Sequence, residues 1–246
     1  MSTPSYAEFV SAVRREGATL AGVGRIGLDD PVPTCPGWTV GRLLLHVGRV
    51  YRFAAEVLET RATSAPDRPE PPAEGTDPVE YLLDGLDEVI AALGEVESDT
   101  PVWNWSGQPD VAVFWARRMA HESLIHRIDG KLAHDVANVI DADLAVDGID
   151  ELLDTMAPRA FARGLSGLAG ILHLEATDSD ARWTAKMTPD SIAVTRGPNG
   201  ARSADVTLRG KASDLLLVLY NRADIDTVDV TGDEELIRSW REQVRL

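Results

Sequence analysis

Apolar residues recur at every third or fourth position in four segments of the first 140 residues, and this spacing constrains the fold most. The clearest stripe runs from Val40 through Leu43, Leu44 and Val47 to Val57. Because a helix turns once every 3.6 residues, such a stripe lies on one face of a helix. Helices of this kind bury their stripes against one another, which predicts a four-helix bundle. We expect its helices over residues 4–22, about 40–60, 78–93 and about 111–134.

Helix-start signals agree with two of these boundaries. Thr39 precedes the second stripe, and its hydroxyl can accept a hydrogen bond from the first helical turn. Asp77 is followed by Pro78 at the first helical position and by Glu80 at the third. Thr39 and Asp77 are therefore predicted to be N-caps.

The pattern changes near residue 165, where short segments alternate apolar and polar residues, as half-buried strands do. A helix over 141–161 and a glycine-rich hinge over 163–170 precede this region, and Pro198-Asn199-Gly200 marks a turn within it. We expect strands at 171–177, 183–187, 192–196, 204–209 and 228–230, and helices at 212–220 and 233–244.

Together these patterns predict an α+β fold, in which a four-helix bundle precedes a small α/β domain of antiparallel sheet plus helices. We expect the bundle at residues 1–140, a connecting helix and hinge at 141–164, and the C-terminal α+β domain at 165–246.

Composition excludes some partners. The net charge of −16 argues against nucleic acid and anionic membranes, since both require a basic surface. Cys35 is the single cysteine, so no internal disulfide can form, as is usual in a reducing cytosol. No signal peptide or membrane span is evident. We expect a cytoplasmic protein, monomeric or weakly dimeric, that acts on a small molecule.

The segment that carries the chemistry is R-R-M-A-H-E-S-L-I-H-R-I-D, residues 117–129. Glu122 and His126 are four residues apart, which places both on one helix face. A carboxylate and an imidazole in this arrangement are two ligands of a three-ligand metal site, whose open position would take water or substrate. The same spacing also occurs in plain surface pairs, so the pair alone is a weak signal.

His46 is the candidate third ligand, since it lies in the apolar stripe of the second helix. Taken alone, such a histidine is more often a core residue with a local hydrogen bond. His121 is a rival ligand, but it points about 100° away from Glu122 on the helix. Asp129 either orients a ligand histidine or pairs with a nearby basic residue, Arg127 or Lys131. Cys35 has no base beside it, which favours a packing role over a nucleophilic one.

Two segments resemble the mycothiol-dependent maleylpyruvate isomerase family. They are T-C-P-G-W-T-V-G-R-L-L-L-H-V-G-R-V (34–50) and W-A-R-R-M-A-H-E-S-L-I-H-R-I-D (115–129). The resemblance extends more loosely to L-Y-N-R (219–222) and V-D-V-T-G-D (228–233). It implies a DinB-like bundle with a small C-terminal domain and a divalent metal, usually zinc, held by His46, Glu122 and His126. It also implies that Arg222 serves the substrate pocket, although a helix C-terminal arginine can equally interact with the helix dipole.

The resemblance implies mycothiol as the thiol cosubstrate. The function expected is that of a metal-dependent enzyme, a mycothiol-dependent isomerase or S-transferase acting on a small, maleylpyruvate-like electrophile. Two alternatives use the same residues. One is a non-catalytic metal-containing protein that binds or carries a small molecule. The other is a thiol-independent hydrolase with metal-activated water.

Overall fold

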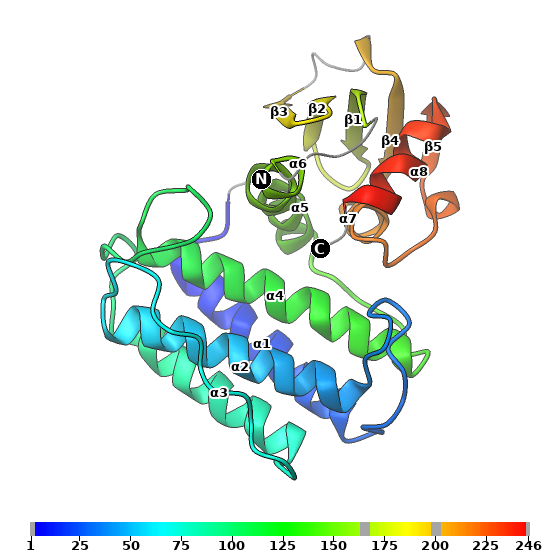
Figure 1. The fold of residues 1–246 in the computed structure, drawn as a ribbon. Coiled ribbons are helices and arrows are strands. Elements are labelled where there is room, and N and C mark those ends of the chain that lie inside the picture. Colours follow the sequence, from blue (N-terminus) through cyan, green and yellow to red (C-terminus); the bar gives the residue numbers. More distant parts are fainter. Residues whose placement is uncertain (1–2, 163–167, 198–202, 245–246) are drawn as a thin grey trace. The chain divides into compact units, whose positions relative to one another are not determined.

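The computed structural model describes residues 3–162, 168–197 and 203–244, and it divides into two compact units, Ser5–Asn138 and Val139–Leu246 (Figure 1). Each unit is described by itself. The predicted turn at 198–200 and most of the predicted hinge at 163–170, including the boundary near 165, lie outside the described residues.

The N-terminal unit is the predicted four-helix bundle. Ser5 begins the first helix and shares a capping box with Glu8, while Thr39 and Asp77 cap the second and third helices as predicted. The helices are α1 (Tyr6–Gly24), α2 (Val40–Glu59), α3 (Pro78–Gly94) and α4 (Ala112–Ala133).

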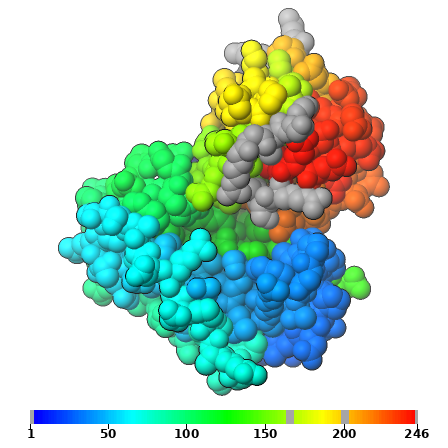
Figure 2. Space-filling view, in the orientation of Figure 1, coloured from blue at the N-terminus to red at the C-terminus, as the bar shows by residue number. Residues whose placement is uncertain are grey.

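Within the bundle, α1 packs mainly on α4 and α2 mainly on α3. The second contact depends on Gly48, because a Cβ there would lie 3.0 Å from the carbonyl oxygen of Tyr81 and 3.1 Å from the Cα of Leu82. The connection from α2 to α3, residues 60–77, crosses the face of the bundle seen in Figures 1 and 2. Arg49 Nε of α2 donates a hydrogen bond of 2.7 Å to the carbonyl oxygen of Pro69 in this connection.

A buried ion pair joins α1 to α4. Arg127 Nε donates a hydrogen bond of 2.8 Å to Glu16 Oε2, and Arg127 Nη1 donates one of 2.7 Å to Asn138 Oδ1. The side chains of Arg127 and Glu16 are 3% and 8% exposed. A charge removed from water to this extent requires a partner. This contact therefore fixes the rotation of α4, which carries the candidate site.

The C-terminal unit contains a sheet with helices. Where one helix was predicted over 141–161, the chain forms two helices with a π-helical turn between them. Pro158 explains the wider turn, because it cannot donate a backbone hydrogen bond and its ring crowds the carbonyl of the preceding turn. The elements are α5 (Ala142–Glu151), η1 (Leu152–Met156), α6 (Ala157–Phe161), β1 (Gly170–Ala176), β2 (Arg182–Thr188), β3 (Ser191–Arg196), β4 (Val206–Gly210), α7 (Ala212–Leu219), η3 (Ile225–Thr227), β5 (Asp229–Gly232) and α8 (Glu234–Gln243).

The sheet is mixed, which corrects the prediction of an antiparallel sheet. Its strand order is β3-β2-β1-β4-β5, and β1 pairs in parallel with β4, with Leu174 opposite Leu208. The other strand pairs are antiparallel. Alternation in the sequence shows which side chains share a face, but it is the same for both strand directions, so it could not reveal the parallel pair. The fold class itself, a helical region followed by an α/β region, is confirmed.

No helix among the described residues combines the length and apolarity that crossing a bilayer requires.

Candidate metal centre

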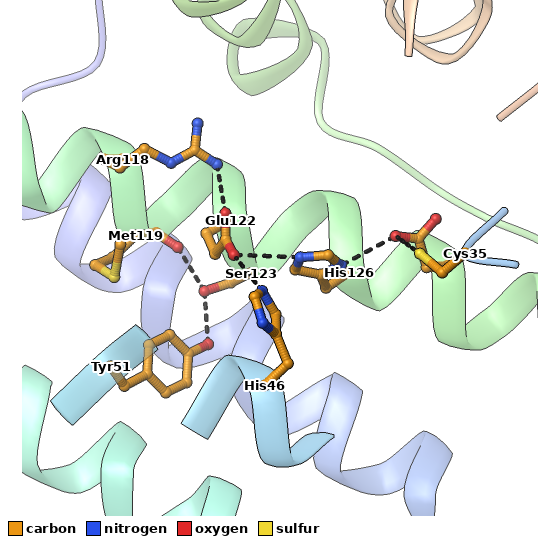
Figure 3. Close-up of polar contacts among 9 residues, drawn as sticks. Cys35, His46, Tyr51, Arg118, Met119, Glu122, Ser123 and His126 are labelled. Carbon is orange, nitrogen blue, oxygen red and sulfur yellow. Dashed lines mark hydrogen bonds and ion pairs between the residues drawn. The ribbon is translucent and has the colours of Figure 1, made fainter. Parts of the chain in front are cut away.

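The structure brings the three predicted metal ligands together. Glu122 and His126 lie one turn apart on α4, and His46 of α2 faces them (Figure 3). Glu122 Oε1 lies 3.3 Å from His46 Nε2 and 3.2 Å from His126 Nε2. One ligand atom from each residue lies within 4.8 Å of the other two. Two residues on one helix and a third from 76 positions away therefore point their donor atoms at a common place.

The cluster lies at the edge of the bundle interior. The side chains of Glu122 and His126 are 17% and 14% exposed, whereas that of His46 is 38% exposed. His46 is thus less buried than its place in the apolar stripe predicted. Trp38 packs edge-on against the His46 ring, with centroids 4.9 Å apart, and the Arg42 guanidinium lies over Trp38. The cluster is therefore open to solvent on the His46 side.

Asp129 orients His126, which is one of its two predicted roles. Asp129 Oδ2 lies 3.0 Å from His126 Nδ1, and the side chain of Asp129 is fully buried. Carboxylates in this position fix the ring and tautomer of a metal-binding histidine, so that its other nitrogen faces the metal. Arg127, one of the two alternative partners, forms an ion pair with Glu16.

The turn before α2 holds Asp129 from the other side. Thr34 Oγ1 donates a hydrogen bond of 2.5 Å to Asp129 Oδ1. The Cys35 thiol donates a long one, 3.7 Å, to Asp129 Oδ2. Cys35 therefore contacts the carboxylate that holds His126, and ligand atoms of Cys35, His126 and Asp129 also lie within 4.8 Å of one another. The packing role of Cys35 stays a prediction.

The electrostatics of the cluster favour a cation. Burial alone would raise the pKa of Glu122, but the charges of His126 and Arg118 hold that pKa well below its usual range. Burial alone would lower the pKa of His126, but the charge of Glu122 and the hydrogen bond to Asp129 raise it to about 9. In the metal-free protein, a proton on His126 therefore occupies the position of positive charge between two carboxylates.

The remaining candidates lie elsewhere. His121 is buried on another face of α4, edge-on to Phe9 of α1. Arg222 belongs to the C-terminal unit, in the turn after α7, where its Nη1 donates a hydrogen bond of 2.6 Å to the carbonyl oxygen of Tyr220.

Comparisons with known proteins agree with this architecture. Residues 9–129 match the mycothiol maleylpyruvate isomerase N-terminal domain, and residues 143–239 match the C-terminal domain of the same family. The chain belongs to the mycothiol maleylpyruvate isomerase family. Membership of this enzyme family, predicted from two sequence segments, is thereby confirmed.

Two solved structures share the fold. They are the crystal structures of the mycothiol-dependent maleylpyruvate isomerase and of a variant in which one histidine is replaced by alanine. Each is 17% identical to this chain with a TM-score of 0.57, over 95% of this chain and 97% of the other. No curated protein sequence matches the chain.

Sequence reasoning missed two residues that support the cluster in this family member. Arg118 Nη2 donates a hydrogen bond of 2.9 Å to Glu122 Oε2, and its position four residues before Glu122 is a signal that spacing alone could have provided. Thr34 is 95 positions from Asp129, and no spacing rule connects them.

Proposed function

We propose that this protein is a metal-dependent enzyme that uses a low-molecular-weight thiol, mycothiol, to isomerise or to S-conjugate a small electrophile such as maleylpyruvate. The observation that carries the proposal is the convergence of His46, Glu122 and His126 at a place that solvent can reach. The identity of the thiol and of the substrate class rests on the family.

The three residues fit a divalent metal, and we propose zinc. Zinc in proteins takes imidazole nitrogens and carboxylate oxygens at about 2.0–2.2 Å, so two ligands of one tetrahedral ion lie about 3.4 Å apart. The separations of 3.2 and 3.3 Å between Glu122 Oε1 and the two Nε2 atoms are close to that value. With three protein ligands, a bound zinc would keep a place for the substrate thiol and lower its pKa, favouring the thiolate near neutral pH.

The residues of the chain prepare this place. Glu122 stays ionised because positive charge lies on two sides of it. Asp129 accepts a hydrogen bond from the Nδ1–H of His126, which leaves Nε2 of that ring to act as a ligand. His46, the most exposed of the three, marks the side from which thiol and electrophile approach.

The reaction proposed for a cis-enedioic substrate has two steps. The thiolate adds to one carbon of the double bond, forming a C–S bond, and the displaced electron pair moves to the adjacent carbonyl oxygen as an enolate. After rotation about the new single bond, the electron pair returns, the trans double bond forms, and the C–S bond breaks. The thiolate is regenerated, so no oxidant or reductant is required. If the adduct is protonated instead of eliminating, the product is an S-conjugate.

We propose that Arg222 binds a carboxylate of the substrate. A guanidinium can bind a carboxylate through two parallel N–H donors, and in the structure Nη1 of Arg222 donates a hydrogen bond to the Tyr220 carbonyl oxygen. That hydrogen bond is also what a helix C-terminal role predicts, so the substrate role of Arg222 rests on the family resemblance.

We place the activity in the cytoplasm, because a low-molecular-weight thiol is kept reduced there and the chain has only one cysteine.

Thiol dependence tests the proposal. Metal-loaded protein is incubated with maleylpyruvate with and without mycothiol, and the loss of substrate is followed. We expect turnover only with the thiol. Turnover without any thiol would identify the hydrolase with metal-activated water instead. No consumption of maleylpyruvate or of general thiol-reactive electrophiles would leave a binding or carrier protein.

Elemental analysis tests the metal separately. We expect about one zinc per chain in the wild type and loss of that zinc, with loss of activity, in His126→Ala and Glu122→Ala. His134→Ala is the matched control, since it removes a histidine just after α4 whose Nδ1 faces Asp30 rather than the cluster. Stoichiometric metal retained in His126→Ala would refute the ligand assignment.

A further inference from the structure

The two oxygens of the Glu122 carboxylate have different partners. Oε1 faces the Nε2 atoms of His46 and His126, at 3.3 and 3.2 Å. Oε2 accepts the hydrogen bond from Arg118 Nη2, at 2.9 Å. In Figure 3, Arg118 lies on the opposite side of Glu122 from both histidines. One oxygen is therefore available to a metal, and the other is held by a guanidinium.

Helix stability does not account for this arrangement. Arg118 lies four residues before Glu122, and a basic residue on the N-terminal side is the less favourable order for such a pair. The side chain of Arg118 is only 6% exposed, and burying a guanidinium costs free energy that ion pairing seldom recovers in full. A buried arginine also stays charged at any relevant pH. The pair thus places a permanent positive charge beside the predicted ligands.

We propose that Arg118 is a positioning residue with two effects on the metal site. It reserves Oε2, so that Glu122 offers the metal a single oxygen. Its charge also offsets that of Glu122. With a divalent ion bound, the ion and Arg118 are positive while Glu122 and Asp129 are negative, which leaves the site with one surplus positive charge. That surplus favours an anionic ligand, such as a thiolate, at the open position. This inference rests on the proposed metal site and adds the class of ligand that the site selects.

Cobalt substitution tests the first effect, since the visible d–d bands of Co²⁺ weaken as its coordination number rises. We expect Arg118→Met to free Oε2 for chelation and to weaken these bands. Arg118→Lys and Arg118→Gln, which keep a donor near Oε2, should retain the wild-type bands. Arg117→Met is the matched control, because Arg117 is the neighbouring arginine on α4 and is half-buried.

Anion binding tests the second effect. Thiocyanate and 2-mercaptoethanol are titrated into the Co²⁺ proteins, and the dissociation constants are read from the absorption changes. We expect affinity to fall about tenfold in Arg118→Met and Arg118→Gln, which lack the charge, as a loss of about 1.4 kcal/mol would give. Arg118→Lys should bind within about threefold of wild type, and Arg117→Met should not differ from it.

The outcomes separate this inference from the proposed function. Wild-type spectra and anion affinity in Arg118→Met would overturn the role of Arg118 and leave the metal site intact. Failure of the wild-type protein to bind Co²⁺ or Zn²⁺ would overturn both. If Arg118→Met does not fold, Arg118→Gln against Arg118→Lys decides, since equal anion affinity in these two variants would refute the effect of charge.

Discussion

The two units of this protein place their charged side chains differently. In the bundle, α4 carries Arg118, Arg127 and Asp129 into the interior, where each meets a partner at hydrogen-bonding distance. In the C-terminal unit, α5 also buries Asp147 and Glu151, but the ion pairs made by the strand arginines lie nearer solvent. Arg196, for example, is 44% exposed where it meets Asp150 and Asp154.

This difference concerns the free energy of burying charge. Buried ion pairs contribute little to stability compared with apolar packing of the same volume, whereas exposed pairs cost little to make. The bundle therefore gains a preorganised cluster of polar side chains from its interior charges rather than a more stable core. The C-terminal unit packs apolar residues such as Trp183 and Leu208 between sheet and helices and keeps most of its charge outside.

The comparison predicts that breaking the buried Glu16–Arg127 pair of the bundle lowers stability far more than breaking a partly exposed ion pair of the C-terminal unit. Glu16→Ala would remove the carboxylate that meets Arg127 Nε in the bundle interior, so we expect a loss of about 3–5 kcal/mol in the free energy of unfolding. Asp154→Asn, at the partly exposed pair with Arg196, should cost about 1 kcal/mol or less. Urea denaturation of both variants measures the difference. Equal losses would show that the bundle does not depend on its interior charges.

Two histidines, one in each unit, predict opposite responses to pH in the metal-free protein. The pKa of His126 is raised to about 9. The stability that protonated His126 contributes is therefore fully present below its unfolded pKa of about 6.5 and is lost as pH rises through 9. Burial lowers the pKa of His173 in the folded protein. The stability that neutral His173 contributes is therefore present above its unfolded pKa of about 6.5 and is lost as pH falls through its lowered folded pKa.

Denaturation in the presence of a chelator, from pH 5 to pH 9.5, checks these signs. We expect His126→Gln to reduce the fall in the free energy of unfolding at alkaline pH. We expect His173→Asn to reduce the fall at acidic pH. Each variant should leave the other side unchanged. A shared response of both variants at one end of the range would contradict the distinction between the two environments.

The two units also differ in how far sequence predicts them. The start of α2 at Thr39 and the Glu122–His126 pair follow from local rules, because capping and helical spacing involve residues a few positions apart. The approach of His46 required either the structure or the family resemblance, since nothing local fixes which helices touch. The parallel pairing of β1 with β4 was not predictable from alternation, whereas Pro158 is a sequence signal for a break in the helix predicted over 141–161.

Removal of the Thr34 hydroxyl tests whether the hydrogen bonds around Asp129 affect zinc affinity. This hydroxyl donates the short hydrogen bond to Asp129 Oδ1, and Asp129 in turn orients His126. Thr34→Val keeps the shape of the side chain and removes the donor. We expect zinc affinity, measured by competition with a chromophoric chelator, to fall about tenfold, the lower end for residues behind a ligand. Thr39→Val, which removes only the cap of α2, is the control and should leave the affinity unchanged.

Replacement of Cys35 should have the smallest effect on zinc binding. The effect of this replacement on turnover distinguishes a supporting role from a catalytic one. The Cys35 thiol is a weak donor and lies 3.7 Å from Asp129 Oδ2, the oxygen that also meets His126 Nδ1. Cys35→Ala should therefore weaken zinc binding by less than about threefold, because Thr34 still holds the carboxylate. Turnover with mycothiol should persist, since the thiol that reacts comes from solution. Loss of turnover with unchanged zinc content in Cys35→Ala would instead make Cys35 a participant in the reaction, and the polar contacts around Asp129 would then belong to the chemistry rather than to its support.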